Sequence, residues 1–394
     1  MSDANRVQLS YRKEVTYGTI DPGAFKTVRF TGESLQQAID TTVSQEIRAD
    51  RQTADFIRTG LRSNGDTNWE YSYKTYQDLF EYGLFSAPGT TAVVVTLGAT
   101  TVAVGGSAGT FTLTRSAGDW IADGITTAKI GQWVRTTGFV NAANNDTAKV
   151  LTVTAAVLTV THCSFVTESA VASTTVTLLS ELTAGTTLSS VSIEKAYTDN
   201  ATAFAEYTGQ LINQMSMTGT ANGIITGSFG WLGKSEVSRS ATIGTSYTPS
   251  HSTVTPVMNG IDNLVACFEG GASNPLFSFN FTINNNLRER LQMGTLGPIS
   301  IATGQIAISG QIVLYFVDAT LPNKFLNFTA SNLVLKFRDA SGNRQIWDFP
   351  RVKYSTGPRT AGGINQDVFI TLGFQGFLHS TQLQSLRVAL SDGP

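Results

Sequence analysis

The sequence predicts a mainly β protein. It would contain two repeated units, each an antiparallel β-sandwich or barrel sheet with one short helix, plus an inserted small β-sandwich or barrel domain. Three observations lead to this prediction: apolar and polar residues alternate along many segments, two stretches of the chain resemble each other, and the first stretch is interrupted by a segment of different composition. Strict alternation is typical of strands with one buried and one polar face.

The repeat is visible at two places. The segment 65–71 resembles 310–316, and an apolar stripe follows each of them. The segment 225–231 resembles 368–374, but its offset is shorter by about 100 residues, close to the length of the segment between Ala87 and Val191. A duplicated unit with one insertion explains both offsets. We therefore assign 1–87 with 191–245 to the first unit, 88–190 to the insert and 246–394 to the second unit.

Several segments carry the alternation that predicts strands. The apolar positions are Phe277, Phe279, Phe281 and Ile283; then Ile306, Ile308, Ile312, Leu314 and Phe316; then Leu333, Leu335 and Phe337. Each strand should bury one face and expose a polar one. Met215 to Trp231 reads as a β-hairpin, in which Asn222-Gly223 would supply positive φ angles.

Helical signal is scarce. Tyr76, Leu79, Phe80, Gly83 and Leu84 form an apolar stripe with the period of a helix that lies on a sheet. The segment 322–328 is its counterpart in the second unit, with Pro322 tolerated in the first turn.

The segment 88–190 is rich in Thr, Val, Ala and Gly. It contains short strand-like runs at 92–97, 111–114, 133–137 and 174–179. Regularly spaced short strands favour a small sandwich or barrel. Because insertions are tolerated at exposed loops, we expect this domain to project from the outer surface.

The composition limits the kinds of partner that the protein can have. Of 394 residues only 14% are charged, against about a quarter in ordinary soluble domains, so much of the surface should be hidden against copies of the chain. The net charge of −2 provides no attraction to nucleic acid or to a membrane surface. We expect both cysteines to be reduced, and we expect no signal peptide and no membrane anchor, with synthesis in a cytoplasm.

No residue pattern indicates catalysis. The three histidines lack partners at metal-ligand spacing, and adjacent His162-Cys163 favours a solvated pair over a ligand pair. Asp119 and Asp123 favour a polar turn over a calcium site. We therefore expect no catalytic, cofactor or metal site, and we expect that the protein is not an enzyme.

The most polar stretch is Ser44 to Asp66. Its charged residues include Glu46, Arg48, Asp50, Arg51, Asp55, Arg58 and Arg62. The stretch is either a solvated loop or an arm that reaches a neighbouring subunit. We favour the arm, because long ordered loops are usually functional and alternating charge specifies docking register. Leu287 to Thr303, with Arg288 and Arg290, would be the counterpart in the second unit.

Several segments resemble the tail tube proteins of long-tailed, non-contractile phages. They are the motif Glu46-Ile47-Arg48-Ala49-Asp50-Arg51-Gln52, the strand 65–73, the acidic segment 76–80, the hairpin end 227–234, and 123–145 within the insert. The resemblance covers most of the chain, and its motifs are structural.

The resemblance implies a structural virion protein. Such proteins form rings whose sheets join into one continuous barrel around a channel, and the rings stack head to tail into the tail tube, a conduit for DNA from capsid to host. The implied partners are the protein itself, the tape measure, tail terminator and tail tip proteins, and phage DNA in transient, non-specific passage. The implied place of assembly is the cytoplasm of the host bacterium, with no cofactor.

Ring size follows from the duplication. Many members of this family have one tube domain and form hexamers, so two units per chain predict a trimer with a pseudo-sixfold barrel, with the hexamer as the alternative. The competing interpretation of the whole chain is a β-rich phage or bacterial adhesin with 88–190 as its recognition module.

Overall fold

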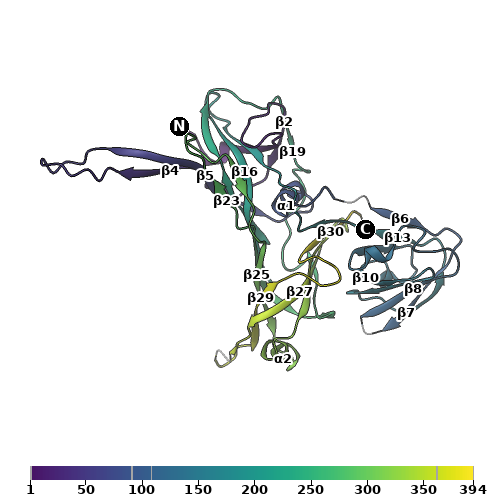
Figure 1. The fold of residues 1–394 in the computed structure, drawn as a ribbon. Helices are drawn as coiled ribbons and strands as arrows, with labels where there is room; N and C mark the ends of the chain where they lie inside the picture. The colour runs from purple at the N-terminus through teal and green to yellow at the C-terminus, as the bar shows by residue number, and fades with distance from the viewer. Residues whose placement is uncertain (1, 90–91, 108, 361–362, 394) are drawn as a thin grey trace.

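The computed structural model describes residues 2–89, 92–107, 109–360 and 363–393 (Figure 1). The protein is mainly β, as predicted, and its described part contains two α-helices, α1 (Gln77–Gly83) and α2 (Thr320–Leu326). Short 3₁₀ turns occur at Ala4–Arg6, Thr127–Lys129 and Ala142–Asn144. In Figure 1 an arm projects from one side of the molecule and a separate β domain lies on the other.

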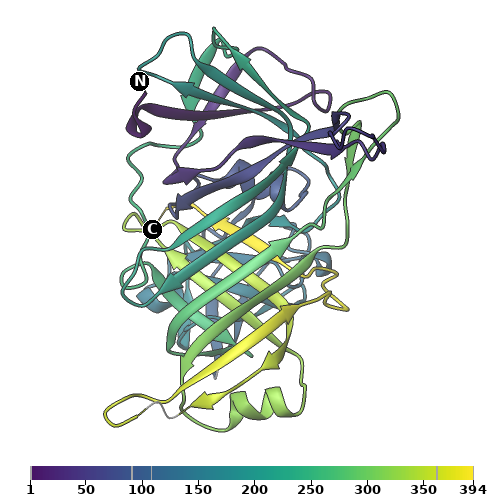
Figure 2. The ribbon, with the colours of Figure 1, turned by 90° about the vertical axis from the view of Figure 1, so that its left-hand side faces the viewer.

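Eight antiparallel strands form a continuous surface, which we call the long sheet (Figure 2). In spatial order they are β4 (Gln36–Val43), β5 (Phe56–Glu70), β17 (Thr226–Gly233), β16 (Phe204–Thr220), β22 (Leu276–Asn284), β25 (Ala307–Tyr315), β29 (Phe369–Gly376) and β27 (Arg344–Thr356). Short strands β3 (Gly32–Glu33) and β28 (Arg359–Thr360) extend its two ends by pairing with β5 and β29.

A second layer covers one face of the long sheet. Behind the first half it consists of β2 (Ala24–Val28), β1 (Val7–Lys13), β15 (Val191–Tyr197), the start of β16 and β18 (Ser235–Arg239), with β19 (Ser246–Pro249) parallel to β2. Behind the second half it consists of β21 (Ala272–Ser273), β20 (Leu264–Glu269), β26 (Ser331–Arg338), the start of β27, β30 (Arg387–Ser391) and β14 (Ser180–Thr183). In each half one long strand, β16 or β27, passes from one layer into the other.

The pairing order of the second half repeats that of the first. In the long sheet β4–β5–β17–β16 corresponds to β22–β25–β29–β27, and in the second layer β1–β15–β16 corresponds to β20–β26–β27. The two halves join inside the chain, because β16 pairs with β22 over Gln214–Thr220 and Ser278–Asn284.

One apolar core serves both halves. The ring of Phe80 on α1 lies 5.1 Å from that of Trp347 on β27 and 5.6 Å from that of Phe229 on β17. The indole N–H of Trp347 donates to the hydroxyl of Tyr71 at 3.1 Å. All these side chains are buried. The halves are therefore one packing unit, which neither could form alone.

The predicted strands and both helices are present, with three differences in detail. Phe277 and Phe316, predicted on buried faces, are exposed: a bulge between Leu276 and Ser278 shifts the alternation of β22, and Phe316 lies beyond the end of β25. The prediction of a polar face on the strand 333–337 is wrong: Val334 and Lys336 are buried, because the inserted domain covers that face. The β16–β17 hairpin exists, but neither Asn222 nor Gly223 has a positive φ. The amide of Gly223 instead donates to the carbonyl of Thr220, closing an ordinary four-residue turn.

The strands between residues 93 and 178 form a sheet of their own. Their order is β12 (Glu168–Val171), β7 (Val102–Ser107), β8 (Thr110–Arg115), β11 (Val157–Thr161), β10 (Thr147–Val153), β9 (Trp133–Thr137), β13 (Thr175–Leu178) and β6 (Val93–Thr96). This open antiparallel sheet surrounds a separate apolar core. The next strand, β14, pairs with β30 in the large assembly, although the sequence places it within the insert.

A buried contact holds this domain against β26, β27 and β30. Trp133 packs with Phe268, Val334, Ile346 and other apolar side chains. Lys149 forms an ion pair with Asp348 at 2.7 Å, and both side chains are buried. Glu181 on β14 accepts from the backbone amide of Trp133 at 2.7 Å and forms a buried ion pair with Arg387 on β30, also at 2.7 Å. The domain is thus fixed to the second half by charges that are largely excluded from water.

Candidate assembly interface

The chemically reactive side chains are occupied in structural roles. His162 is buried and its Nε2 lies 2.8 Å from Oδ1 of Asn332 on β26, so the expectation of a solvated His162-Cys163 pair is wrong. Burial raises the pKa of the Cys163 and Cys267 thiols to about 12. His251 and His379 lie elsewhere on the molecule. Among the described residues, no group of three or more His, Cys, Asp or Glu is placed to hold a metal ion.

The two aspartates weighed as calcium ligands serve a turn. The carboxylate of Asp119 accepts from the backbone amide of Ile121 at 2.7 Å, and Asp123 pairs with Arg115 at 2.6 Å. Arg115 in turn lies over the Trp120 ring, 4.8 Å from its centroid.

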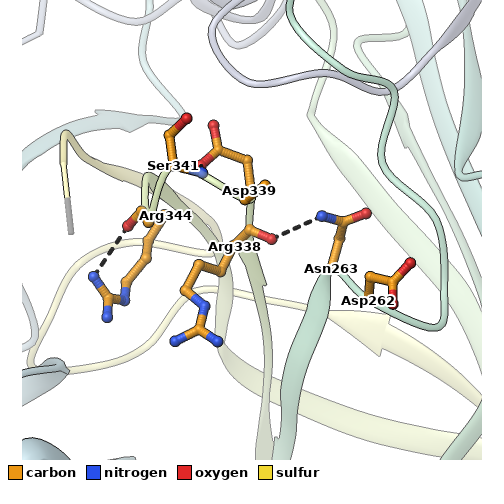
Figure 3. A pocket seen from close by; sticks show the side chains of 8 residues that line it. Asp262, Asn263, Arg338, Asp339, Ser341 and Arg344 are labelled. Atoms are coloured by element: carbon orange, nitrogen blue, oxygen red, sulfur yellow. Dashed lines mark hydrogen bonds between the residues drawn. The ribbon is translucent and has the colours of Figure 1, made fainter.

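A hollow at the β26–β27 turn is lined by polar side chains (Figure 3). Its aspartate, Asp339, accepts from the amides of Ser341 and Asn343, each at 2.9 Å. Arg344 donates to the carbonyl of Gly342 and forms an ion pair with Asp146 of the inserted domain at 3.0 Å. Asn263 fixes the other wall by donating to the carbonyl of Arg338. The polar groups of this hollow therefore hold the turn in place.

The arm is the β4–β5 hairpin, which continues beyond the body of the protein (Figure 1). Val43 pairs with Phe56 and Ile39 pairs with Leu61, with a bulge between Asp40 and Thr41. Residues 44–55 form an irregular tip closed by the amide of Ser44, which donates to the carbonyl of Asp55.

The charged arm residues separate into two groups. Glu46, Arg48, Asp50, Arg51 and Asp55 lie at the tip, whereas Arg58 and Arg62 lie on β5. Arg48 and Asp50 form an exposed ion pair at 2.7 Å, and this contact lowers the pKa of Asp50. Water and salt screen an exposed pair of this kind, so it contributes little to stability and the arm's charges are poorly explained by folding.

The second unit's candidate segment lies at the base of the arm. Arg288 and Arg290 are on β23 (Arg288–Arg290), which pairs with β24 (Ser300–Ala302). Arg62 pairs with Asp40 at 2.7 Å and lies 3.8 Å from Glu289. The structure thus brings Arg62 to the 288–290 segment and leaves the tip residues apart from it.

Charge patterns alone miss one side of the arm. Ile39, Val43, Phe56 and Leu61 share the side of the hairpin that carries Ser63, Thr67 and Trp69 of β5 into the core, because a bulge at Thr59 shifts the alternation of β5 by one residue. Ile39 and Phe56 are 50% and 65% exposed. The signal was available in the sequence as period-two alternation, but the surrounding charges obscured it.

Both ends of the long sheet have unpaired edges. Within the described residues, β4 pairs only with β5, and β28 pairs only with β29. These ends are the counterparts of β22 and of the end of β16, which pair with each other inside the chain. Exposed edges of this length are templates for another strand.

The face of the long sheet that points away from the core is lined mainly by uncharged polar side chains. One row across it consists of Asn68, Ser228, Ser216, Thr282, Ser309, Gln375 and Lys353. The hydroxyls of Ser216 and Ser228 lie 2.8 Å apart, within hydrogen-bonding distance. This polar face lies on the side opposite the inserted domain (Figures 1 and 2).

Comparison with known families gives one match. A family model described as phage tail tube protein matches residues 4–376. The search of curated proteins found no match. Among the described residues, no helix is long and apolar enough to cross a membrane.

Proposed function

This chain belongs to the phage tail tube protein family, and we propose that three copies of it form a ring whose stacked repeats make a conduit for DNA. Membership of the family makes it a structural protein of the phage tail. The trimeric ring, the stacking and the passage of DNA are the content of the proposal.

The junction between β16 and β22 carries the proposal. It joins two halves that have the same strand order, and it leaves the equivalent edges unpaired at the two ends of the chain. The same junction, repeated between protomers, pairs the β27–β28 edge of one copy with the β3–β4 edge of the next. Pairing of this kind removes both exposed edges of the long sheet once the ring closes.

Three chains then supply six equivalent halves. This matches the sixfold barrel implied by the resemblance for one-domain members, and the repeated pairing order supports the predicted division into two units and an insert. The inserted domain occurs once per chain, so a trimer carries three of them per ring on the side away from the polar face.

The polar face is suited to line the channel. Its Ser, Thr, Asn and Gln side chains interact with water and carry no charge that would hold phosphate. Because each neutralised phosphate adds affinity, a conduit with few cations lets DNA pass without retaining it.

The arm is suited to connect rings. It continues the long sheet beyond its own body, and its alternating charges at Glu46, Arg48, Asp50, Arg51, Asp55, Arg58 and Arg62 specify register with a neighbour. Arg288 and Arg290 lie beside its base. The tape measure, tail terminator and tail tip proteins are the further partners of such a tube, with assembly in the host cytoplasm.

Electron microscopy of the purified protein tests the proposal. We expect long tubes with a central hole, and ring cross-sections that show three inserted domains. Discrete particles without a channel would contradict the tube, and six inserted domains per ring would contradict the trimer.

An edge variant tests the junction itself. The carbonyl of Pro358 accepts from the amide of Thr371, so the amide of the next residue, Arg359, points away from β29 toward the unpaired edge. We expect Arg359→Pro to fold but form no rings, because proline lacks the donor and blocks strand addition. Arg359→Ala, which removes only the side chain, is the control and should form rings. Normal rings from the proline variant would show that another edge is used.

A further inference from the structure

We propose that a pocket at one end of the second layer binds the phosphate group of an organic phosphate ester. The pocket lies where β1 begins and where β2 and β19, which run side by side in Figure 1, both end. Two arginines and a histidine line it, Arg6, Arg29 and His251. The pocket is complete within one chain, so the inference does not depend on the tube proposed above.

The lining of the pocket combines basic side chains with no acid. No described residue that lines it is an aspartate or a glutamate. Three other hollows of similar size each place two acidic side chains beside their cations, and these acids are Asp262 and Asp339, Glu269 and Asp318, and Glu81 and Asp392. Cations that gather without an acid repel each other, and a bound anion removes this repulsion. The lining therefore favours an anionic ligand.

Both arginines are held in place and have donors that remain available. Nη1 of Arg29 donates to the carbonyl of Thr255 at 2.7 Å, which fixes the half-buried guanidinium beside the pocket. The carbonyl of Arg6 accepts from the amide and the hydroxyl of Thr198, at 2.8 and 2.7 Å, which fixes the backbone there. Within the described part of the chain neither arginine forms an ion pair. A guanidinium can donate two parallel N–H bonds to phosphate oxygens, which is the contact that these side chains can offer.

The acids near the pocket are engaged elsewhere. Asp392 lies within electrostatic range of His251, but its carboxylate accepts from the ammonium of Lys74 at 2.6 Å. Asp199, within range of Arg6, accepts from a backbone amide at 2.8 Å. The charge of the pocket is therefore not cancelled by either carboxylate.

Hydroxyl and apolar side chains complete the walls. The hydroxyl of Ser250 donates to the carbonyl of Thr75 at 2.8 Å, and its amide donates to the carbonyl of Thr27 at 3.2 Å, so this wall is fixed. Val28 and Phe30 add apolar surface. The pocket has a volume of about 390 Å³, within the range of roughly 300–1,000 Å³ that small-ligand sites have. A phosphate fills only part of it, so the ligand carries an organic group that contacts the apolar wall.

The ligand is distinct from the DNA of the proposed channel. None of the residues that line the pocket belongs to the long sheet, so the pocket does not open on the polar face. A phosphate ester in the surrounding solution, free or as part of a polymer, has the required chemistry.

Isothermal titration calorimetry of the unassembled full-length protein tests the site, with glycerol 3-phosphate as the probe. We expect saturable binding at one site per chain. Arg29→Gln and Arg6→Gln should each weaken this binding by about tenfold or more, because each removes a charged partner of the phosphate. Arg6 is exposed, so its variant keeps the fold even if the loss of the bond to Thr255 unfolds Arg29→Gln, and circular dichroism verifies this.

Arg338→Gln is the matched control, because Arg338 lines a hollow of similar size that also holds two aspartates (Figure 3). Its affinity should equal that of the wild type. No saturable binding by the wild type, or an equal loss in Arg338→Gln, would overturn the site. Inorganic phosphate that binds as tightly as glycerol 3-phosphate would overturn the role assigned to the organic group.

A poly(glycerol phosphate) chain separates the two sources of the ligand. Tighter binding of the polymer, counted per phosphate, would support the site and identify a polymer, whereas equal affinity would support the site and identify a free ester. A protein that binds glycerol 3-phosphate but forms no tubes would overturn the proposed function and leave this site in place.

Discussion

Replacing Lys149 by Met tests whether the inserted domain is fixed to the second half by buried charge. Lys149 and Asp348 are 5% and 0% exposed at the side chain, and their charged atoms are 2.7 Å apart. The other partner of Asp348 is the indole N–H of Trp133, at 3.0 Å. Lys149→Met leaves the carboxylate buried with this neutral donor alone.

The expected loss is large relative to total stability. Removing one partner of a buried ion pair costs about 3–5 kcal/mol, whereas a domain's whole free energy of unfolding is about 5–15 kcal/mol. The double variant Lys149→Met/Asp348→Asn removes the charge and keeps an acceptor for Trp133. Because neutral replacement of a buried pair is often nearly neutral in free energy, we expect it to be more stable than Lys149→Met by about 2 kcal/mol or more.

Urea unfolding of the unassembled protein, followed by circular dichroism, measures the free energy of unfolding of the wild type, of Lys149→Met, of Asp348→Asn and of the double variant. Arg62→Met is the control, because its pair with Asp40 is exposed and should contribute about 0–1 kcal/mol. A cost below about 1 kcal/mol for Lys149→Met, or a double variant as unstable as the sum of both single variants, would refute the reasoning.

Three further predictions follow from buried contacts. Burial lowers the pKa of His162, so the neutral imidazole contributes stability above its unfolded pKa of about 6.5, and this stability is lost as the pH falls. The urea midpoint should therefore drop between pH 7 and pH 5, and it should drop less in the variant His162→Gln. Equal drops in the two proteins would contradict this. Deleting residues 92–178 leaves Lys336 and Asp348 without their partners Asp146 and Lys149, so this deletion variant should fail to fold. The same deletion combined with Lys336→Met and Asp348→Asn should give soluble protein. Equal thermal midpoints of the two deletion variants would show that these ion pairs are dispensable. A Cβ at Gly227 would lie 2.2 Å from the Trp69 ring and 2.3 Å from the carbonyl of Ser216, so Gly227→Ala should lower the free energy of unfolding by about 1–3 kcal/mol, and an unchanged urea midpoint would contradict the overpacking.

Alternation predicted the strands well because each has one face on a common core. Phe279, Phe281 and Ile283 are buried on β22 as their spacing indicates. The same pattern failed at Lys336, whose burial depends on Asp146 and Trp133 in a segment some 190 residues earlier in the chain. A local period cannot report which distant surface will cover the second face of a strand.

The candidate arm was predicted from charge, and the structure shows what charge could not indicate. Its strands begin at Gln36 and Phe56, so half of the polar stretch is regular hairpin rather than loop. The apolar side at Ile39 and Phe56 depends on pairing register, which a bulge at Thr59 of β5 shifts by one residue. Register and bulges depend on the partner strand, and single-sequence patterns do not contain them.

The shared core of Phe80, Phe229 and Trp347 makes the β16–β22 junction a permanent one. In a ring of three chains, half of the six sheet junctions therefore form during folding, at the very high effective concentration of an intramolecular contact. Only three junctions depend on encounters between molecules, so three chains must associate to close a ring. A subunit with one tube domain needs six chains for the same ring. Mechanical load on the tube would correspondingly open the seams between chains first, since the internal seams separate only when the core unfolds.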